Sequence, residues 1–483
     1  MLKLERIPVP GINIIVPVIM VLAPAVFLLL DFGSFLATIE VKFAFLLALL
    51  LIAAGGNIIY SHVKKTGMLF DGYILLWLSF IFVYLVSAAC HLLNTNSELH
   101  GFYDMIESGS PAMVGRIYYS LLIVVIALVA LRLGLGADAS DGLQPHEQLK
   151  VNYRLLLALG VFFTVVSAIG TVRLFGGIPS LRTVLTVNRY METGGGTARY
   201  VFISQWLSWG LTFLTIYFLH TRAARSRGIF LLWFGFAACG IVANIFWSGS
   251  RASSIISLLP GFLLLQRLKP KYVKSVLVLI AVLFSAYFSL CTYLRSENFA
   301  DYRLGEHLTA VFDWQMGRFS MVGLGIEMVD SEGMGKGLTL LDGIVNAVNA
   351  PSTLLKLPAL LPVPQSAPSI VGEYLVGDPE VRGIVPGSIF DFYYNFGLIG
   401  VAAGYFIIGK IVQKGNTILR KTDSMGVFLV WSYVIVTLSV CCIPGTATGW
   451  VYYLVTTGFP ALCFLGCEAS LSRNRLSALS FAR

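Results

Sequence analysis

Four arginines and only one acidic residue lie in the segment 173–199 (RLFGGIPSLRTVLTVNRYMETGGGTAR). The segment contains no lysine, and an arginine fork can bind a diphosphate or a carboxylate through two parallel hydrogen bonds. Arg182 and Arg189 lie centrally, whereas Arg173 and Arg199 flank apolar runs and have the positions of ordinary membrane anchors. The pattern predicts an anion site at the two central arginines. Attraction to lipid headgroups, which are themselves phosphates, is the alternative explanation.

Another arginine follows a Gly-Ser turn in the sequence SGSRASS, residues 248–254. A helix that begins at this turn directs backbone N–H groups and the positive end of its dipole toward an anion. Arg251 and the serine hydroxyls would complete such a site. Alternatively, Arg251 extends from a short helix to the membrane interface. Arg303 and Arg318 are two further candidates to hold a phosphate or a neighbouring carboxylate.

His307 and Glu373 are the residues best suited to accept a proton from an attacking hydroxyl group. His307 is the only histidine in the segment 295–387, and a group that titrates near neutral pH suits a general base. Glu373, in the sequence GEYLVGDPE, is the second candidate, and Asp391 is a third. A surface histidine without a chemical role explains His307 equally well.

Three aromatic residues, Trp314, Tyr374 and Tyr394, could stack on sugar rings, although aromatic side chains also gather at membrane interfaces. The sequence has no zinc-protease motif, no Walker A motif and no dinucleotide-binding glycine pattern. Asp31 is not part of a paired acidic motif, and the seven cysteines do not have zinc-site spacing. We therefore expect neither a metal nor another cofactor.

Apolar runs must position these side chains, because the chain has the composition of a membrane protein. Of its 483 residues 57% are hydrophobic and 12% are charged, with a mean hydropathy of +0.80, whereas about a quarter of the residues in soluble domains are charged. A helix of about 20 apolar residues crosses a hydrocarbon core of ~30 Å. The predicted spans are residues 11–30, 41–60, 72–92, 112–131, 155–172, 201–219, 229–246, 248–265, 273–294, 389–411, 425–442 and 449–467.

Lysine and arginine gather in alternate connections between these spans, as they do in the cytoplasmic loops of membrane proteins. The basic stretches are residues 62–65, 222–227, 267–274 and 410–421, and the C-terminal tail. We therefore predict that both termini face the cytoplasm and that the segments 173–199 and 295–387 face outward. Because the net charge of +9 is divided among the loops in this way, it does not indicate a nucleic-acid partner.

The segment 295–387 is too long for a simple connection and is expected to be a functional region. At 100° per residue, charged and apolar side chains separate onto opposite sides of the stretch 302–329. The pattern predicts an amphipathic helix there, which lies on the bilayer surface and turns its charged side toward a cavity. Since no internal repeat or soluble domain boundary is evident, residues 1–483 are expected to form a single polytopic membrane domain.

In this arrangement the chain resembles the bacterial O-antigen (Wzy-type) polymerases, which join oligosaccharide repeat units, and the related O-antigen ligases. The shared features are about twelve spans, an arginine-rich outer segment, a Gly-Ser-Arg turn between two later helices and one very long outer segment. The sequence GIVPGSIFDFYYNFGLIG at residues 383–400 also resembles the entry into the helix that follows the long segment. Asp391 stands where many relatives are expected to have a glutamate.

The resemblance implies an all-α bundle of about twelve transmembrane helices, similar to GT-C-like lipid-sugar transferases, in the bacterial inner membrane. It implies a metal-independent glycosyltransferase that joins polyprenyl-pyrophosphate-linked repeat units at the periplasmic face. Membrane lipids and a chain-length regulator are the further partners expected. The charge of the leaving diphosphate would be stabilised by arginines; the candidates are Arg182, Arg189, Arg251, Arg303 and Arg318.

Two alternatives remain open. A ligase or another lipid-sugar transferase would have the same fold and donor but would transfer the glycan to a different acceptor. A transporter of an anionic lipid-linked sugar belongs to a different class, and such proteins often carry charges within their spans and consist of two similar halves. Mid-span charges are scarce here and the long segment lies on one side only, which favours an enzyme.

Overall fold

The computed structural model describes residues 39–66, 71–93, 111–136, 149–175, 198–220, 251–268, 317–380 and 384–481. Within these ranges the protein is helical, and the only β contact is an isolated parallel bridge between Lys150 and Ser424. Long apolar sequences favour this arrangement because a helix satisfies its own backbone hydrogen bonds without water. The predicted all-α class is therefore confirmed for the described residues.

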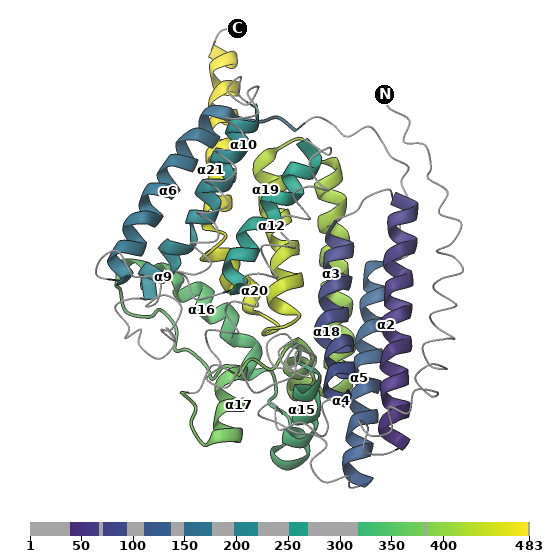
Figure 1. The fold of residues 1–483 in the computed structure, drawn as a ribbon. Coiled ribbons are helices and arrows are strands. Elements are labelled where there is room, and N and C mark those ends of the chain that lie inside the picture. Colours follow the sequence, from purple (N-terminus) through teal and green to yellow (C-terminus); the bar gives the residue numbers. More distant parts are fainter. Residues whose placement is uncertain are drawn as a thin grey trace, which may run out of the picture.

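Most of the described helices run along the long direction of the bundle, whereas three do not. The long bundle contains α2 (Ile39–Thr66), α3 (Gly72–Phe80), η2 (Ile81–Val86), α4 (Ser87–Leu93), α5 (Pro111–Leu135), α6 (Tyr153–Phe175), α9 (Ala198–Gln205), α10 (Leu207–His220), α12 (Arg251–Leu268), α18 (Ser388–Lys421), α19 (Met425–Thr437), η6 (Leu438–Cys442), α20 (Gly449–Val455) and α21 (Phe459–Phe481). The three other helices are α15 (Phe319–Glu332), α16 (Leu338–Leu355) and α17 (Ala367–Val376). The helices α15 and α17 lie at the end drawn at the bottom of Figure 1, and α16 rises from it toward α9 and α20.

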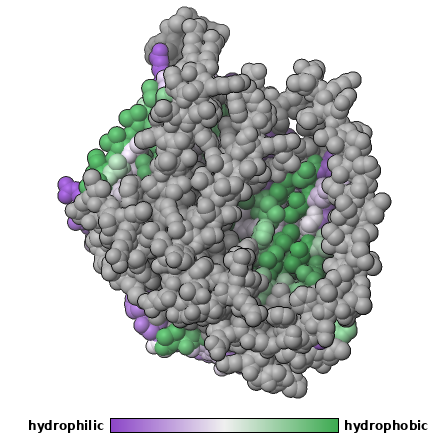
Figure 2. Space-filling view, viewed as in Figure 1, coloured by the Kyte–Doolittle hydropathy of each residue, from purple (hydrophilic) through white to green (hydrophobic). Residues whose placement is uncertain are grey.

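Six helical segments within the described residues are long and apolar enough to cross a membrane, and a seventh span results if the bent pair α20 and α21 is counted as one. These segments match the predicted spans 41–60, 72–92, 112–131, 155–172, 389–411, 425–442 and 449–467. Large apolar side chains are exposed along the outer side of α6, at the left edge of Figure 2, as expected for a surface that faces lipid.

Of the five remaining predicted spans, two fall on described helices and three lie outside the described residues. The span 201–219 is observed as α9 and α10, which are interrupted at Trp206, and the span 248–265 corresponds to α12. The predicted spans 11–30, 229–246 and 273–294 lie outside the described residues. A total of twelve spans therefore stays a prediction.

The helices α5 and α18 pack along each other through glycines. A Cβ atom added at Gly134 would collide with the carbonyl group of Phe406, and one added at Gly409 would lie 2.8 Å from the carbonyl oxygen of Leu131. Small residues let helix backbones approach closely in membranes, where van der Waals contact rather than exclusion of water drives association. The glycines therefore fix how closely α18 lies against α5.

Two neighbouring spans each contain a turn of π-helix, η2 and η6. The hydroxyl group of Tyr84, in η2, donates to the carbonyl oxygen of Ile443 at 2.9 Å and accepts from the backbone N–H of Ile389 at 3.0 Å. It thus connects the end of η6 to the first turn of α18. π-Helical turns are rare and frequently lie at functional sites. Here η2 contacts α15, and Tyr84 of η2 contacts Ile443, which follows η6.

Of the amphipathic helix predicted over residues 302–329, residues 302–316 lie outside the described residues, and the remainder is not observed in the predicted form. Gly317 and Arg318 are not helical, and α15 begins at Phe319. The backbone N–H of Arg318 donates to the carbonyl oxygen of Val83 at 3.0 Å, outside any helical ladder. Buried residues occupy most sides of α15, which packs against α5 and α18 rather than resting on a bilayer. For residues 317–329 the prediction was wrong, because tertiary packing is available to this apolar segment.

At the opposite end of the bundle, basic residues from several connections meet. Lys150 Nζ lies 2.5 Å from Asp423 Oδ2, and this hydrogen bond lowers the pKa of Asp423 below its ordinary value. Arg267 Nη2 donates to the carbonyl oxygen of Thr422 at 2.7 Å. The described connections that are rich in lysine and arginine therefore lie at one end, as their alternation along the sequence predicts.

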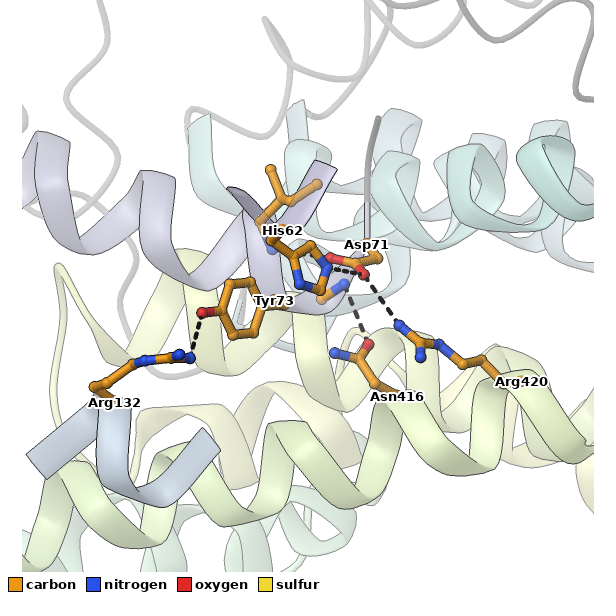
Figure 3. A network of polar contacts seen from close by, with 8 residues as sticks. His62, Asp71, Tyr73, Arg132, Asn416 and Arg420 are labelled. Atoms are coloured by element: carbon orange, nitrogen blue, oxygen red, sulfur yellow. Dashed lines mark hydrogen bonds and ion pairs between the residues drawn. The ribbon is translucent and has the colours of Figure 1, made fainter. Parts of the chain in front are cut away.

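The polar network in Figure 3 connects α2, α3 and α18 at this basic end. Asp71 caps α3, since its Oδ1 accepts from the backbone N–H of Ile74 at 2.9 Å. Its Oδ2 lies 2.8 Å from His62 Nε2 and 3.5 Å from Arg420 Nη2. Tyr73 stacks on the His62 ring at 4.1 Å. A single carboxylate thus both begins α3 and attaches it to two neighbouring spans.

Candidate functional site

A cluster of polar side chains joins α5, α15 and α17 at the end of the bundle away from the basic network. Arg116 Nη1, from α5, lies 2.7 Å from Glu327 Oε2, on α15. The hydroxyl group of Tyr374, on α17, donates to Glu327 Oε1 at 3.1 Å. Glu327 therefore has one carboxylate oxygen on an arginine and the other on a phenol. We refer to Arg116, Glu327 and Tyr374 as the Glu327 cluster.

Local sequence determines how the three elements present these side chains. Glu327 is the only charged residue in the first ten positions of α15, whose other side chains are largely buried. The helix α17 begins at Ser366, whose hydroxyl accepts from the backbone N–H of Ser369, and ends at Gly377 with φ +74°. Glycine suits that left-handed C-cap because it has no Cβ. This short, capped helix brings Tyr374 to Glu327.

The Glu327 cluster is accessible to solvent, since the Arg116 and Glu327 side chains are 40% and 29% exposed. An exposed ion pair of this kind adds only about 0.2–1 kcal/mol to stability, so it is weak evidence for a purely structural role. Burial, and then the hydrogen bond to the Glu327 carboxylate, raise the pKa of Tyr374 above its ordinary value, against an opposing effect of Ser331. Tyr374 therefore stays protonated near neutral pH and keeps its role as a donor.

The chemistry of the Glu327 cluster suits a ligand rich in hydroxyl groups or phosphate. A guanidinium group is a planar fork of donors, and a carboxylate accepts hydrogen bonds from hydroxyl groups. A carboxylate of this kind could also accept the proton of an attacking hydroxyl group. Within the described residues, no group of three or more His, Cys, Asp or Glu side chains is arranged to hold a metal ion.

Of the two residues predicted as general bases, only Glu373 is described. It is exposed on α17, next to Tyr374 in sequence, and its Oε2 accepts from Gln365 Nε2 at 3.2 Å. It therefore lies on the same short helix as Tyr374, but its hydrogen-bond partner Gln365 does not belong to the Glu327 cluster. His307 lies outside the described residues, and its role stays a prediction.

Arg318 holds a backbone turn. Its Nε donates to the carbonyl oxygen of Pro444 at 2.9 Å and its Nη1 to that of Gly317 at 2.5 Å. These contacts fasten α15 to the turn that follows η6, so the described geometry gives the guanidinium a positioning role. Diphosphate binding by Arg318 stays a prediction.

Three of the four other predicted diphosphate ligands, and one aromatic residue, lie outside the described residues. Arg182, Arg189, Arg303 and Trp314 lie in undescribed segments. Arg251 is the first residue of α12, as the predicted helix start requires, but the position of its side chain is not described.

Tyr394 differs from the expectation of an open stacking face for a sugar. It is buried, and its ring stacks on Phe390 with a centroid distance of 5.7 Å and an interplanar angle of 10°. Both rings belong to a small apolar cluster with Leu324, Met328 and Val371. In this conformation Tyr394 packs α15 and α17 against α18. Tyr374, the other described aromatic candidate, is the one with a polar partner.

Asp391, the third candidate base, is completely buried in a hydrogen-bond network. Its Oδ2 accepts from the backbone N–H of Ala447 at 2.8 Å, and its Oδ1 accepts from the hydroxyl group of Thr339. Asn395 donates to Asp391 Oδ1 at 3.3 Å and accepts from the backbone N–H of Gly337 at 2.8 Å. The network attaches the start of α16 to α18, which makes Asp391 a positioning residue.

Sequence reasoning missed Arg116 and Glu327. Each could have been recognised in the sequence as an isolated charge within an apolar run. Arg116 lies in the run 112–131, and Glu327 lies in the sequence FSMVGLGIEMV. Charged residues in such positions are costly and are often functional. The sequence does not show that the two meet, because they are separated by about two hundred positions.

No protein-family model, curated protein or solved structure matches the chain. The functional argument therefore depends on the described geometry and on the features of the sequence.

Proposed function

We propose that the protein polymerises polyprenyl-pyrophosphate-linked oligosaccharide repeat units into O-antigen or a similar surface polysaccharide. The reaction takes place at the periplasmic face of a bacterial inner membrane, and both termini face the cytoplasm. The observation that carries the proposal is the solvent-accessible Glu327 cluster, in which Glu327 and Tyr374, on helices of the long segment, meet Arg116 on α5. The sequence features shared with Wzy-type polymerases supply the reaction class.

The location of the Glu327 cluster supports a reaction on the outer side. Arg116 and Arg132 both lie on α5, and Arg132 Nη1 donates to the Tyr73 hydroxyl at the basic end at 2.7 Å. At a rise of 1.5 Å per residue the two arginines are separated by about 24 Å along the helix. Because basic connections favour the cytoplasm, the opposite end, with Glu327, is expected to face outward.

In the proposed step, a sugar hydroxyl of one lipid-linked glycan attacks the anomeric carbon of another. The new C–O bond forms as the bond to the diphosphate breaks, and the hydroxyl proton passes to a carboxylate or imidazole. Glu327 joins His307 and Glu373 as a candidate for that base, with Arg116 orienting its carboxylate. The leaving diphosphate requires stabilisation of its charge, for which the predicted arginines Arg182, Arg189 and Arg251 remain the candidates.

The test is a gene deletion that is complemented with variants. In the deletion strain, electrophoresis of the surface polysaccharide should show single repeat units and no ladder, and the wild-type gene should restore the ladder. Glu327→Gln should fail to restore it, since loss of a general base lowers rates by about 10²–10⁴. Glu332→Gln, an exposed position on the same helix, is the matched control and should restore the ladder.

Other outcomes identify the alternatives. Polymer that accumulates on its lipid carrier without attachment to the cell surface would indicate a ligase. Repeat units that remain on the cytoplasmic side would indicate a transporter. A normal ladder in Glu327→Gln would exclude Glu327 as the base and leave His307 and Glu373 to be tested in the same way.

A further inference from the structure

The helix α16 exposes its large apolar side chains and buries its small ones. Four exposed positions recur every three or four residues along one side, Leu338, Leu341, Ile344 and Val348, and Leu355 follows seven residues later; their exposed fractions run from 43% to 68%. The buried side consists of small residues: Thr339, Gly343, Ala347 and Ala350. A helix at a water-facing surface has the reverse arrangement. Small residues inward and large aliphatic ones outward are typical of helices packed within lipid.

The exposed apolar surface continues into the chain that follows α16. Asn349 Nδ2 donates to the carbonyl oxygen of Leu361 at 2.8 Å, and Asn349 Oδ1 accepts from the backbone N–H groups of Leu360 and Leu361 at 2.9 and 3.0 Å. The amide thereby holds residues 357–363 back against the helix. Four more aliphatic side chains are exposed there: Leu357, Leu360, Leu361 and Val363. We call these four and the five exposed residues of α16 the α16 surface.

The α16 surface adjoins a part of α18 that is expected to face hydrocarbon. A Cβ atom added at Gly337 would lie 3.1 Å from the ring of Phe396, so this exposed ring borders the start of α16. Ile399, one turn further along α18, is 81% exposed. No charged residue lies between Asp391 and Lys410, and the part of this stretch after the kink at Phe396 and Gly397, residues 398–409, is about 18 Å of continuous apolar helix. The start of α16 therefore borders the apolar part of α18.

Lysines mark both ends of α16. Lys336 precedes its N-terminus and Lys356 caps its C-terminus, and both are exposed. A lysine near an interface places its alkyl chain along apolar surface and extends its ammonium group toward lipid phosphates. One lysine at each end suits a helix that lies along a leaflet rather than one that crosses the membrane.

We propose that the α16 surface is embedded in the lipid leaflet and anchors residues 317–380 to the membrane. Its occupant is the acyl-chain layer of bilayer phospholipids. Two features favour lipid over a protein partner: the α16 surface is continuous with the exposed apolar side of α18, and a lysine flanks each end of α16. A contact between two proteins would require neither feature. This inference does not depend on the proposed function.

Photo-cross-linking of the full-length protein in native membranes tests the proposal. p-Benzoylphenylalanine is introduced singly at Leu341 and at Val348, which are 48% and 43% exposed. Ile399 is the positive control for lipid, and Asp378, an exposed polar position after α17, is the control for water. Irradiation should give phospholipid adducts at Leu341 and Val348 with yields comparable to that at Ile399, and only background at Asp378.

Two results would overturn the proposal. Adducts at Leu341 and Val348 that are predominantly with another polypeptide, or with a second copy of this chain, would assign the surface to a protein interface. Yields as low as at Asp378 would mean that the surface faces water. Mass spectrometry of the purified protein distinguishes a lipid adduct from a polypeptide adduct directly.

Discussion

Arg116 and Glu327 show how two isolated charges gain a joint role when helices far apart in sequence pack together. Their ion pair is accessible to solvent, so it contributes only about 0.2–1 kcal/mol to stability. Arg116→Lys keeps the charge but removes the guanidinium fork. We expect a nearly unchanged melting temperature in detergent and a clear loss of polymer length, measured by electrophoresis. Arg154→Lys, exposed on α6, should affect neither; an equal loss there would argue against a specific role for Arg116.

The buried network around Asp391 should behave in the opposite way and affect stability. Thr339→Val removes the hydroxyl donor to Asp391 without changing the shape of the side chain. A hydrogen bond to a charged group is worth about 1.5–3 kcal/mol, so the unfolding midpoint in denaturant should fall. Thr339→Ser should restore most of the loss. Thr417→Val, at an exposed position of α18, is the control. An unchanged midpoint in Thr339→Val would contradict the network.

Among the elements, α5 and α18 approach each other closely at glycines. A methyl group at Gly134 would meet the backbone of Phe406, which cannot move aside as a side chain can. Overpacking costs about 1–3 kcal/mol, so Gly134→Ala should lower the melting temperature. Gly115, on the same helix, has nothing within 4 Å of an added Cβ atom. Gly115→Ala should be neutral or stabilise by about 0.5–1 kcal/mol. The same loss at both positions would rule out close packing as the cause.

For the whole molecule, the orientation in the membrane can be tested with α16 and α18. After a kink at Phe396 and Gly397, α18 continues for 24 residues to Lys421, about 36 Å, so its C-terminal part extends beyond a ~30 Å core. A cysteine at Lys336 should react with a membrane-impermeant thiol reagent in intact spheroplasts. A cysteine at Thr417, near the basic end, should react only after permeabilisation. The parent protein measures any reaction of the native cysteines, and the reverse pattern would invert the topology.

Local composition determined much of this fold from the sequence alone. An apolar run of about twenty residues has few alternatives to a transmembrane helix. For this reason six predicted spans recur in the described residues, and a seventh if the bent pair α20 and α21 is counted as one. The alternation of lysine and arginine likewise predicted which described connections lie at one end, since Asp71, Lys150 and Arg267 all approach the last turns of α18. The signals for α16 were weaker, because Asp342, Asn346 and Asn349 interrupt its apolar sequence.

The tertiary structure decided the partners of each polar side chain. The sequence marked Asp391 and Tyr394 as chemical candidates, but the first is completely buried among donors and the second is stacked in an apolar cluster. It did not mark Glu327, which packing brings to Arg116 and Tyr374. Hydropathy is a property of each segment and can be read locally. Whether a carboxylate is enclosed or accessible depends on how helices hundreds of residues apart pack against one another, and only the tertiary structure holds that information.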